Sequence, residues 1–209
     1  MSDTFRLLDE KFPNLNCNPD TDIVVEIGSG TGPGSEGSTE FLYSWAKQRG
    51  LDFYSIDIDD ATKNILGDLD INFAIQSGHE WCRDVLPTIG KQIKVLYLDN
   101  FDYIWESTVY NLELWKNTVG VDFMLNMFEQ QTKKYAERNI ELTRENSMEE
   151  HRLQAMYCLP YMSQQSVVLM DDTHGVPGNI YGKCATAIPL LVEAGYQLSP
   201  RSYQYAYRE

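Results

Sequence analysis

A glycine-rich segment directly after an apolar strand is the feature that most limits the fold of this chain. Residues Ile23–Ile27 form an apolar run, five glycines follow between positions 28 and 37, and a helical pattern begins at Ser38. Glycine adopts positive φ angles easily and lets another group approach the backbone closely. This order of strand, glycine turn and helix N-terminus is typical of α/β folds that hold a ligand at the carboxyl end of the first strand. The alternative is a glycine turn that binds nothing.

The rest of the sequence alternates between short β-rich apolar runs and helical stretches. We expect strands at Ile23–Ile27, Phe53–Ile58, Asn72–Gln76, Ile93–Leu98, Val167–Met170, Tyr196–Leu198 and Tyr203–Tyr207. We expect helices at Ser38–Arg49, Asp60–Leu66, Glu80–Leu86, Ser147–Leu159 and Gly182–Ala194. This alternation indicates a mostly parallel sheet with helices on both faces. The turn between the last two strands is too short for a crossover helix, so that pair should be antiparallel.

Three sequence signals set boundaries for the later helices. Ser147–Glu150 has the spacing of a capping box, which should begin the helix that contains His151. Pro160 should end that helix, and Pro189 should kink or break the last one, because proline cannot donate a backbone hydrogen bond.

The segment Trp105–Asn146 does not follow the strand–helix alternation. It is rich in polar residues, and a helix is predicted from Phe123 to Glu145. It follows the carboxyl end of the predicted fourth strand, where segments that cover a substrate lie in sheets of this kind. We therefore expect one domain over residues 1–209, with this segment as a lid-like helical insertion.

The charge balance restricts the partners of the chain. Lys and Arg number 17 against 31 Asp and Glu, which gives a net charge of −14, and no basic cluster is present. Nucleic acids and anionic membrane surfaces are bound through basic patches, so we expect neither as a partner. A small-molecule substrate remains, and a homodimer is compatible with this composition.

The cysteines and the N-terminal segment bear on the compartment. Cys17, Cys82, Cys158 and Cys184 are far apart and form no CxxC pair, which favours reduced thiols over disulfides or a zinc site. The segment MSDTFRLLDEKF carries acids where a signal peptide has basic residues, and no apolar run approaches the ~18 residues of a membrane span. We expect a cytoplasmic protein.

The glycine spacing argues against a dinucleotide as the ligand. The fingerprint G-x-G-x-x-G requires glycine at its sixth position. Counted from Gly28 that position is Pro33, and counted from Gly30 it is Ser35. The register therefore fails from both starting points.

Two acids favour a different ligand. Glu26 lies two residues before the first glycine, where a carboxylate would repel a pyrophosphate but attract an ammonium group. Asp57 ends the second predicted strand, where a carboxylate can accept hydrogen bonds from the two hydroxyls of a ribose, and Asp59 competes for that role. A ligand with an ammonium group at one end and a ribose at the other is S-adenosylmethionine.

Three motifs resemble those of class I S-adenosylmethionine-dependent methyltransferases. VVEIGSGTG resembles their first motif, YSIDID the end of their second strand, and INFAIQSGHEW their third strand and adenine-side loop. Ser77-Gly78 stands where the family often has an acid. The resemblance covers Asp22–Asn100 and Glu149–Tyr207 and implies a Rossmann-like seven-stranded sheet with a final antiparallel strand. It implies these cofactor-binding residues: Glu26, Gly28, Ser29, Gly30, Thr31, Gly32, Asp57, Ser77 and Asp99.

Acidic residues gather at the ends of the fourth and fifth predicted strands. Asp99 and Asp102 follow the fourth strand, and Asp171 and Asp172 follow the fifth. These ends are neighbours in a parallel sheet, so the carboxylates must be protonated, paired with a cation or bound to a metal. Hard oxygen ligands suit Mg²⁺. The alternative is that these acids only cap turns and helices.

The same acids resemble the pattern of metal-dependent O-methyltransferases of the catechol and macrolide-sugar types. This resemblance implies that Asp99, Asp171 and Asp172 are the metal ligands. The chain departs from the pattern at Asp102, where the macrolide-sugar relatives usually have histidine.

Histidines are the candidates for a general base. His151, His174 and Asp102 form the candidate catalytic set, with His151 as the leading base, although each histidine could equally be an ordinary surface residue. His79 would line the adenine side or have no role. Lys183 would bind an anionic substrate or lie on the solvated surface.

Together these residues predict an enzyme that transfers a methyl group from S-adenosylmethionine to a hydroxyl of a small molecule, with Mg²⁺ bound. The protein would hold both reactants in line and assist loss of the hydroxyl proton. The alternatives are a metal-independent N- or O-methyltransferase with a histidine base, and a non-catalytic nucleotide-binding module of the same fold.

Overall fold

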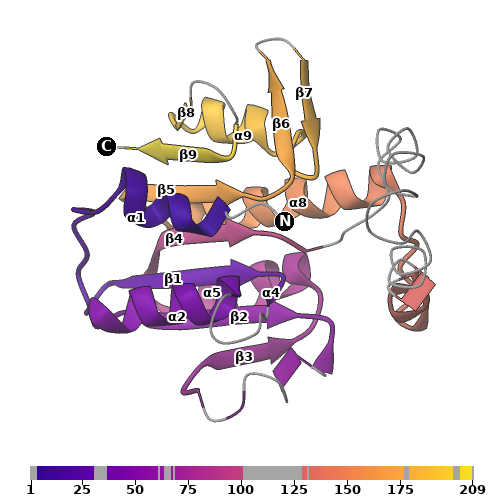
Figure 1. Ribbon diagram of the computed structural model, residues 1–209, viewed down its shortest axis with the longest axis horizontal. Helices are drawn as coiled ribbons and strands as arrows, with labels where there is room; N and C mark the ends of the chain where they lie inside the picture. The colour runs from indigo at the N-terminus through magenta and orange to yellow at the C-terminus, as the bar shows by residue number, and fades with distance from the viewer. Residues whose placement is uncertain are drawn as a thin grey trace, which may run out of the picture.

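The chain folds into a mixed α/β structure around one large sheet (Figure 1). The computed structural model describes residues 4–30, 37–60, 62–63, 67, 69–100, 129–130, 132–176, 179–199 and 203–208. Within these residues a seven-stranded sheet and a separate two-stranded hairpin are formed. The described residues include no helix with the length and apolar composition needed to cross a bilayer.

The strands of the main sheet lie in the order β3-β2-β1-β4-β5-β9-β8. Strands β1 to β5 pair in parallel, whereas β9 pairs antiparallel with both β5 and β8. This confirms the prediction of a mostly parallel sheet with an antiparallel last strand. The strand bounds are β1 (Asp22–Ile27), β2 (Asp52–Asp57), β3 (Asn72–Ile75), β4 (Gln92–Leu98), β5 (Met162–Met170), β8 (Gln197–Leu198) and β9 (Tyr205–Arg208).

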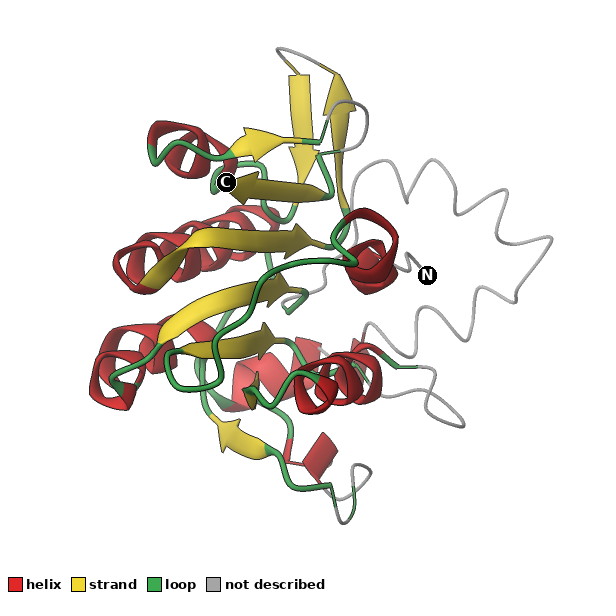
Figure 2. Ribbon diagram, turned by 90° about the vertical axis from the view of Figure 1, so that its left-hand side faces the viewer, coloured by secondary structure: helices red, strands yellow, loops and turns green. Residues whose placement is uncertain are grey.

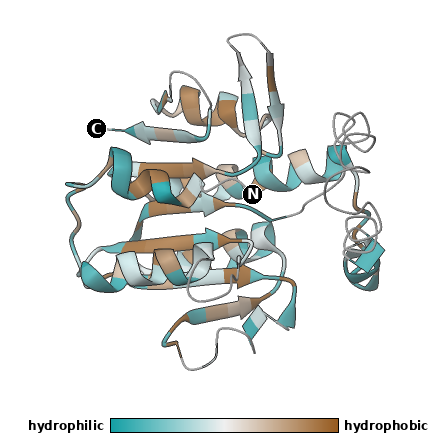
Figure 3. Cartoon of the chain, viewed as in Figure 1, coloured by the Kyte–Doolittle hydropathy of each residue, from teal (hydrophilic) through white to brown (hydrophobic). Residues whose placement is uncertain are grey.

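Helices cover both faces of the sheet, as expected from the nearly continuous apolar strands (Figure 2). In β1, Ile23, Val25 and Ile27 pack into one apolar layer and Val24 packs into the other. Figure 3 shows the apolar strands in the centre of the molecule. The first layer contains α4 (Gly78–Asp84), α5 (Leu86–Ile89), α8 (Arg144–Cys158) and α9 (Ile188–Glu193), and the second contains η1 (Thr4–Arg6), α1 (Leu7–Lys11) and α2 (Ser38–Gln48).

Two predicted helix starts are wrong. Helix α8 begins at Arg144, because the Thr143 side chain caps it by accepting a hydrogen bond from the Asn146 N–H at 3.2 Å. Helix α9 begins at Ile188, so Pro189 lies in its first turn, where its missing N–H has no helical partner to lose, and no kink follows. The predicted end near Pro160 is confirmed, since α8 gives way to the short η2 (Leu159–Tyr161).

A β-hairpin that the sequence did not predict lies directly before the last predicted helix. Strands β6 (Thr173–Val176) and β7 (Asn179–Gly182) pair antiparallel and project from the main sheet (Figure 1). Neither strand has the nearly continuous apolar run that marks β1 and β4 in the sequence. Gly182, predicted as the first helical residue, ends the second strand of this hairpin.

The insertion predicted at Trp105–Asn146 is described only from residue 129 onward, apart from residue 131. Residues 132–137 are helical, but Asn139 has a φ of 58° and the chain stays non-helical up to α8. The described part therefore contradicts a continuous helix from Phe123 to Glu145. The role of the insertion as a lid stays a prediction, and most of the predicted helix Asp60–Leu66 also lies outside the described residues.

Candidate functional site

The predicted site lies at the carboxyl ends of the central parallel strands. The Asp99 N–H donates to the Ile27 carbonyl at 2.8 Å, and the Asp171 N–H donates to the Leu98 carbonyl at 3.0 Å. These bonds continue the sheet beyond β1, β4 and β5, so the residues after the three strands meet at one edge. The order of the strands reverses between β1 and β4, and such a switch point is where open α/β sheets bind ligands.

The first glycine allows two loops to touch. Gly28 has a φ of +94°, and a Cβ at this position would overlap the Asn100 nitrogen and lie 2.5 Å from the Asp99 carbonyl carbon. The glycine is therefore required by contact with the chain after β4, and not only by the approach of a ligand. At Gly30 a Cβ would lie 2.5 Å from the Ser38 hydroxyl, which begins α2.

Glu26 is fully buried and binds two serine hydroxyls. Its Oε1 accepts from Ser38 at 2.7 Å, and its Oε2 accepts from Ser55 at 2.7 Å. Burial raises the pKa of this carboxyl to about 7, although hydrogen bonds from both hydroxyls act in the opposite direction. These contacts join the end of β1 to the start of α2 and to β2. The side chain predicted to face an ammonium group thus holds the framework of the glycine segment.

Asp57 holds the glycine segment from the other side. Its Oδ2 accepts from the Ser29 N–H at 2.8 Å, and its Oδ1 accepts from the Asp59 N–H at 2.7 Å. The Ser29 and Ser55 hydroxyls are 2.6 Å apart, and Ser29 is the donor because Ser55 gives its proton to Glu26. Asp59, the competing ribose ligand, forms an ion pair with Lys134 of the insertion. Predicted ligands Thr31 and Gly32 lie outside the described residues.

A buried lysine lies among the strand-end acids. Lys183 is fully buried, and its Nζ is 2.8 Å from Asp99 Oδ1 and 3.4 Å from Asp172 Oδ2. The Tyr97 hydroxyl donates to the other Asp99 oxygen at 2.9 Å. Asp171 is only 7% exposed, and its Oδ1 has no hydrogen-bond partner among the described residues. The predicted position of Lys183 on the solvated surface is wrong, and a role in binding an anionic substrate stays a prediction.

Two of the three predicted metal ligands pair with an ammonium group. Asp99 and Asp172 both pair with Lys183, and the described residues contain no group of three or more His, Cys, Asp or Glu placed to hold a metal ion. The Lys183 ammonium already supplies one positive charge between these two carboxylates. This donor set does not fit Mg²⁺, which would have to displace a buried lysine.

The two predicted catalytic histidines lie in very different surroundings. His151 is fully buried in α8, and its Nδ1 donates to the Ser147 carbonyl one turn earlier at 2.7 Å. His174 is exposed on β6, with its ring centroid 6.0 Å from that of Tyr181. Asp102, the third member of the set, lies outside the described residues. The structure thus places His151 in the core and His174 on the surface of the hairpin.

A polar chain that sequence reasoning missed crosses the site next to β3. Glu150 of α8 accepts from the Ser77 hydroxyl at 3.2 Å and the His79 N–H at 3.0 Å, and its second oxygen is 2.5 Å from His79 Nδ1. Gln154 donates to Glu150 at 2.9 Å and to Asn100 at 3.0 Å. The hydrogen bond to Glu150 raises the pKa of His79. The i, i+4 spacing of Glu150 and Gln154 was the sequence signal that could have predicted this chain of hydrogen bonds. Glu150 was instead interpreted as part of a capping box.

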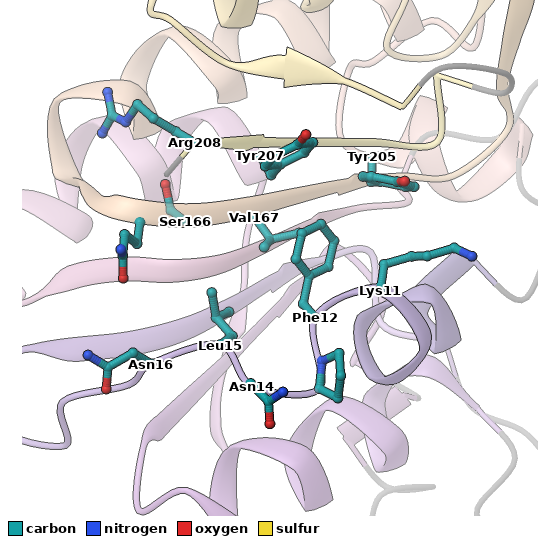
Figure 4. A pocket seen from close by; sticks show the side chains of 12 residues that line it. Lys11, Phe12, Asn14, Leu15, Asn16, Ser166, Val167, Tyr205, Tyr207 and Arg208 are labelled. Atoms are coloured by element: carbon teal, nitrogen blue, oxygen red, sulfur yellow. The ribbon is translucent and has the colours of Figure 1, made fainter.

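A large surface pocket lies away from these residues. It has a volume of about 880 Å³ and lies beside the middle of β5, next to the residues that follow α1 (Figure 4). It is lined by Lys11, Phe12, Pro13, Asn14, Leu15, Asn16, Gln165, Ser166, Val167, Tyr205, Tyr207 and Arg208. None of these was predicted as a site residue, so the pocket is separate from the strand-end chemistry.

Any functional assignment of this chain depends on its own residues. A scan against protein-family models finds no match to this sequence, and a search of curated proteins finds no relative.

Proposed function

We propose that this chain is an S-adenosylmethionine-dependent methyltransferase of the class I type that acts on a small molecule. The observation that carries the proposal is the position of residues 28–30 at the switch point of the sheet, with Asp57 at the end of the neighbouring β2 bound to the Ser29 N–H. The resemblance of the motifs implies a seven-stranded sheet with a final antiparallel strand, and the order β3-β2-β1-β4-β5-β9-β8 agrees with this expectation. The finer Rossmann-like assignment is part of the proposal.

The residues at the switch point fit the cofactor. Asp57 is partly exposed, and a carboxylate can accept about four hydrogen bonds, so it suits a ribose diol while it holds the Ser29 N–H. Ser77 lies at the adjoining end of β3, on the adenine side in the proposed arrangement. Thr31 and Gly32 remain proposed contacts. Glu26 contributes indirectly, because its hydrogen bonds with Ser38 and Ser55 hold the start of α2 and strand β2 in place beside the glycine segment.

The bound cofactor would supply an electrophilic methyl group. The protein's part is to hold an acceptor hydroxyl in line with that methyl and to take up the hydroxyl proton. Asp172 is 45% exposed at its side chain, whereas His151 is fully buried. Asp172 is therefore better placed than His151 to accept this proton.

The arrangement favours the metal-independent form of the reaction. Lys183 pairs with both Asp99 and Asp172 without a divalent ion. Methyl transfer should therefore persist in EDTA. Loss of transfer in EDTA and its recovery with Mg²⁺ would instead support the metal-dependent form expected from the sequence.

One observation favours a second candidate, a nucleotide-binding module without turnover. Glu26 and Asp171 are both buried, so they offer little access to a substrate. Such a module would bind S-adenosylmethionine but leave it unchanged, whereas the proposed enzyme would convert it to S-adenosylhomocysteine in the presence of an acceptor. Chromatography of the bound nucleoside distinguishes the two.

Calorimetry with S-adenosylhomocysteine tests the cofactor. Asp57→Ala should weaken binding by ~1.5–3 kcal/mol, as expected for lost hydrogen bonds to a charged group. Asp52→Ala is the matched control, because Asp52 begins the same strand and its side chain forms an exposed ion pair with Lys91. Its affinity should be unchanged. Preference for NAD, or equal affinity in all three proteins, would overturn the proposal.

A further inference from the structure

Lys183 is held in place by the backbone on both sides of it. Gly182, just before it, has a φ of +111°, and a Cβ there would lie 2.8 Å from the Thr173 Cα and overlap the Asp172 carbonyl. The Cys184 N–H, just after it, donates to the Thr173 hydroxyl at 3.3 Å. That hydroxyl donates in turn to the Asp171 carbonyl at 3.0 Å. The hairpin formed by β6 and β7 begins directly after Asp172, and it therefore brings the chain back so that Lys183 lies beside that residue.

The charges around this lysine require its ammonium group. A fully buried lysine is rare unless it is paired, because removing its charge from water is costly. Here Asp99 and Asp172 supply the pairing at 2.8 and 3.4 Å. Asp171, next to Asp172 in the chain, is more than nine-tenths buried and has an oxygen without a partner among the described residues. Two carboxylates thus pair with one built-in cation, and a third buried carboxyl lies next to them in the chain.

The geometry points to Lys183 as the resident cation of this site, occupying the place where the metal-dependent enzymes that the motifs resemble bind a divalent ion. The three acids are the hard oxygen ligands that such ions prefer. Removing the lysine charge while keeping its length should therefore convert the cluster into a divalent cation site. This inference goes beyond the proposed function, since it depends on neither S-adenosylmethionine nor methyl transfer.

The test is Mn²⁺ binding to the whole protein without cofactor, followed by electron paramagnetic resonance of the free ion. Lys183→Met should bind Mn²⁺ at least ~10-fold more tightly than the wild type, because affinity for such ions rises with the net negative charge of the ligands. Mn²⁺ should also raise the melting temperature of Lys183→Met but not that of the wild type. Adding Asp99→Asn to Lys183→Met should remove the gain. Lys94→Met is the control, because Lys94 is another buried lysine, paired with Asp22 at 3.6 Å away from the site.

Two results would overturn the inference. One is equal Mn²⁺ affinity in the wild type and in folded Lys183→Met. The other concerns folding. If Lys183→Met folds only with Mn²⁺, the inference is supported. If Lys183→Met does not fold at all, the double variant Lys183→Met/Asp172→Asn is tested, which restores the net charge of the cluster and should fold. Failure of that double variant would show that Lys183 is needed for packing and not as a cation. S-adenosylhomocysteine binding is measured separately, so the proposed function stands or falls independently.

Discussion

Glu150 accepts a hydrogen bond from the backbone N–H of His79, 71 positions earlier in the chain, and so caps a helix other than its own. It also contacts the His79 imidazole, and both bonds lie where α4 begins. A carboxylate near a helix N-terminus is favoured by the helix dipole. The contact joins α8 to the end of β3, next to the proposed cofactor site.

This pair should give the protein a pH-dependent stability. The pKa of His79 is raised, chiefly by its hydrogen bond to Glu150, so the folded state binds the proton more tightly than the unfolded state. The stabilisation is complete below the unfolded pKa of roughly 6.5 and is lost as the pH rises through the higher folded pKa. His79→Gln should therefore cost about 1 kcal/mol more at pH 5.5 than at pH 9, measured by urea unfolding. His174→Gln, at an exposed histidine, is the control and should show no such difference. An equal cost of His79→Gln at both values would contradict the assignment.

The contribution of Glu26 to stability should change with pH in the opposite direction to that of an ordinary paired acid. Burial raises its pKa to about 7, so the folded state holds the proton over a range where the unfolded state has lost it. Stability should fall as the pH rises from about 4.5 to about 7 and then level off. Glu26→Gln keeps the shape of the side chain but has no proton to lose in this range. Its free energy of unfolding relative to that of the wild type should therefore increase by up to about 3 kcal/mol between pH 4.5 and pH 8. Parallel stability curves for the two proteins in urea unfolding would refute the buried-carboxyl explanation.

Gly28 should tolerate alanine less well than a glycine with similar strain but open surroundings. Gly28→Ala adds a Cβ that overlaps the backbone at Asn100, in addition to the strain of a φ of +94°. At Gly195 the φ is +87° and no atom lies within 4 Å of the added Cβ. Strain alone costs on the order of 1–3 kcal/mol, so Gly195→Ala measures that part and Gly28→Ala should exceed it by at least ~1 kcal/mol. Equal losses of unfolding free energy for Gly28→Ala and Gly195→Ala, measured in urea, would mean that the loops at Gly28 and Asn100 move apart without an energetic cost.

The sequence predicts the sheet well because its strands carry their own signals. The apolar runs of β1 and β4 and the glycines after Ile27 depend only on neighbouring residues. The short hairpin of β6 and β7 has no comparable local pattern, and residues 183–187 form turns before α9 begins at Ile188. Local signals therefore identified the strands of the main sheet but missed the hairpin and misjudged several helix ends.

The candidate site was less predictable because its contacts are long-range. Lys183 pairs with Asp99 across 84 positions, and nothing near it in sequence marks it as buried. Glu150 has the spacing of a local cap but serves α4. The positions of Asp57 and Asp99 at strand ends followed from the sheet alone, whereas their partners required the folded chain.

The antiparallel pairing of β9 has a consequence for synthesis on the ribosome. Strand β9 lies between β5 and β8, yet both of these precede it in the chain. A nascent chain that has already formed β1 to β5 therefore exposes the unpaired backbone of β5 until residues 205–208 emerge. Open strand edges of this kind recruit other chains. Expression at low temperature or with a chaperone that shields nascent sheet edges should consequently raise the soluble yield, and shortening the interval before β9 emerges should do the same.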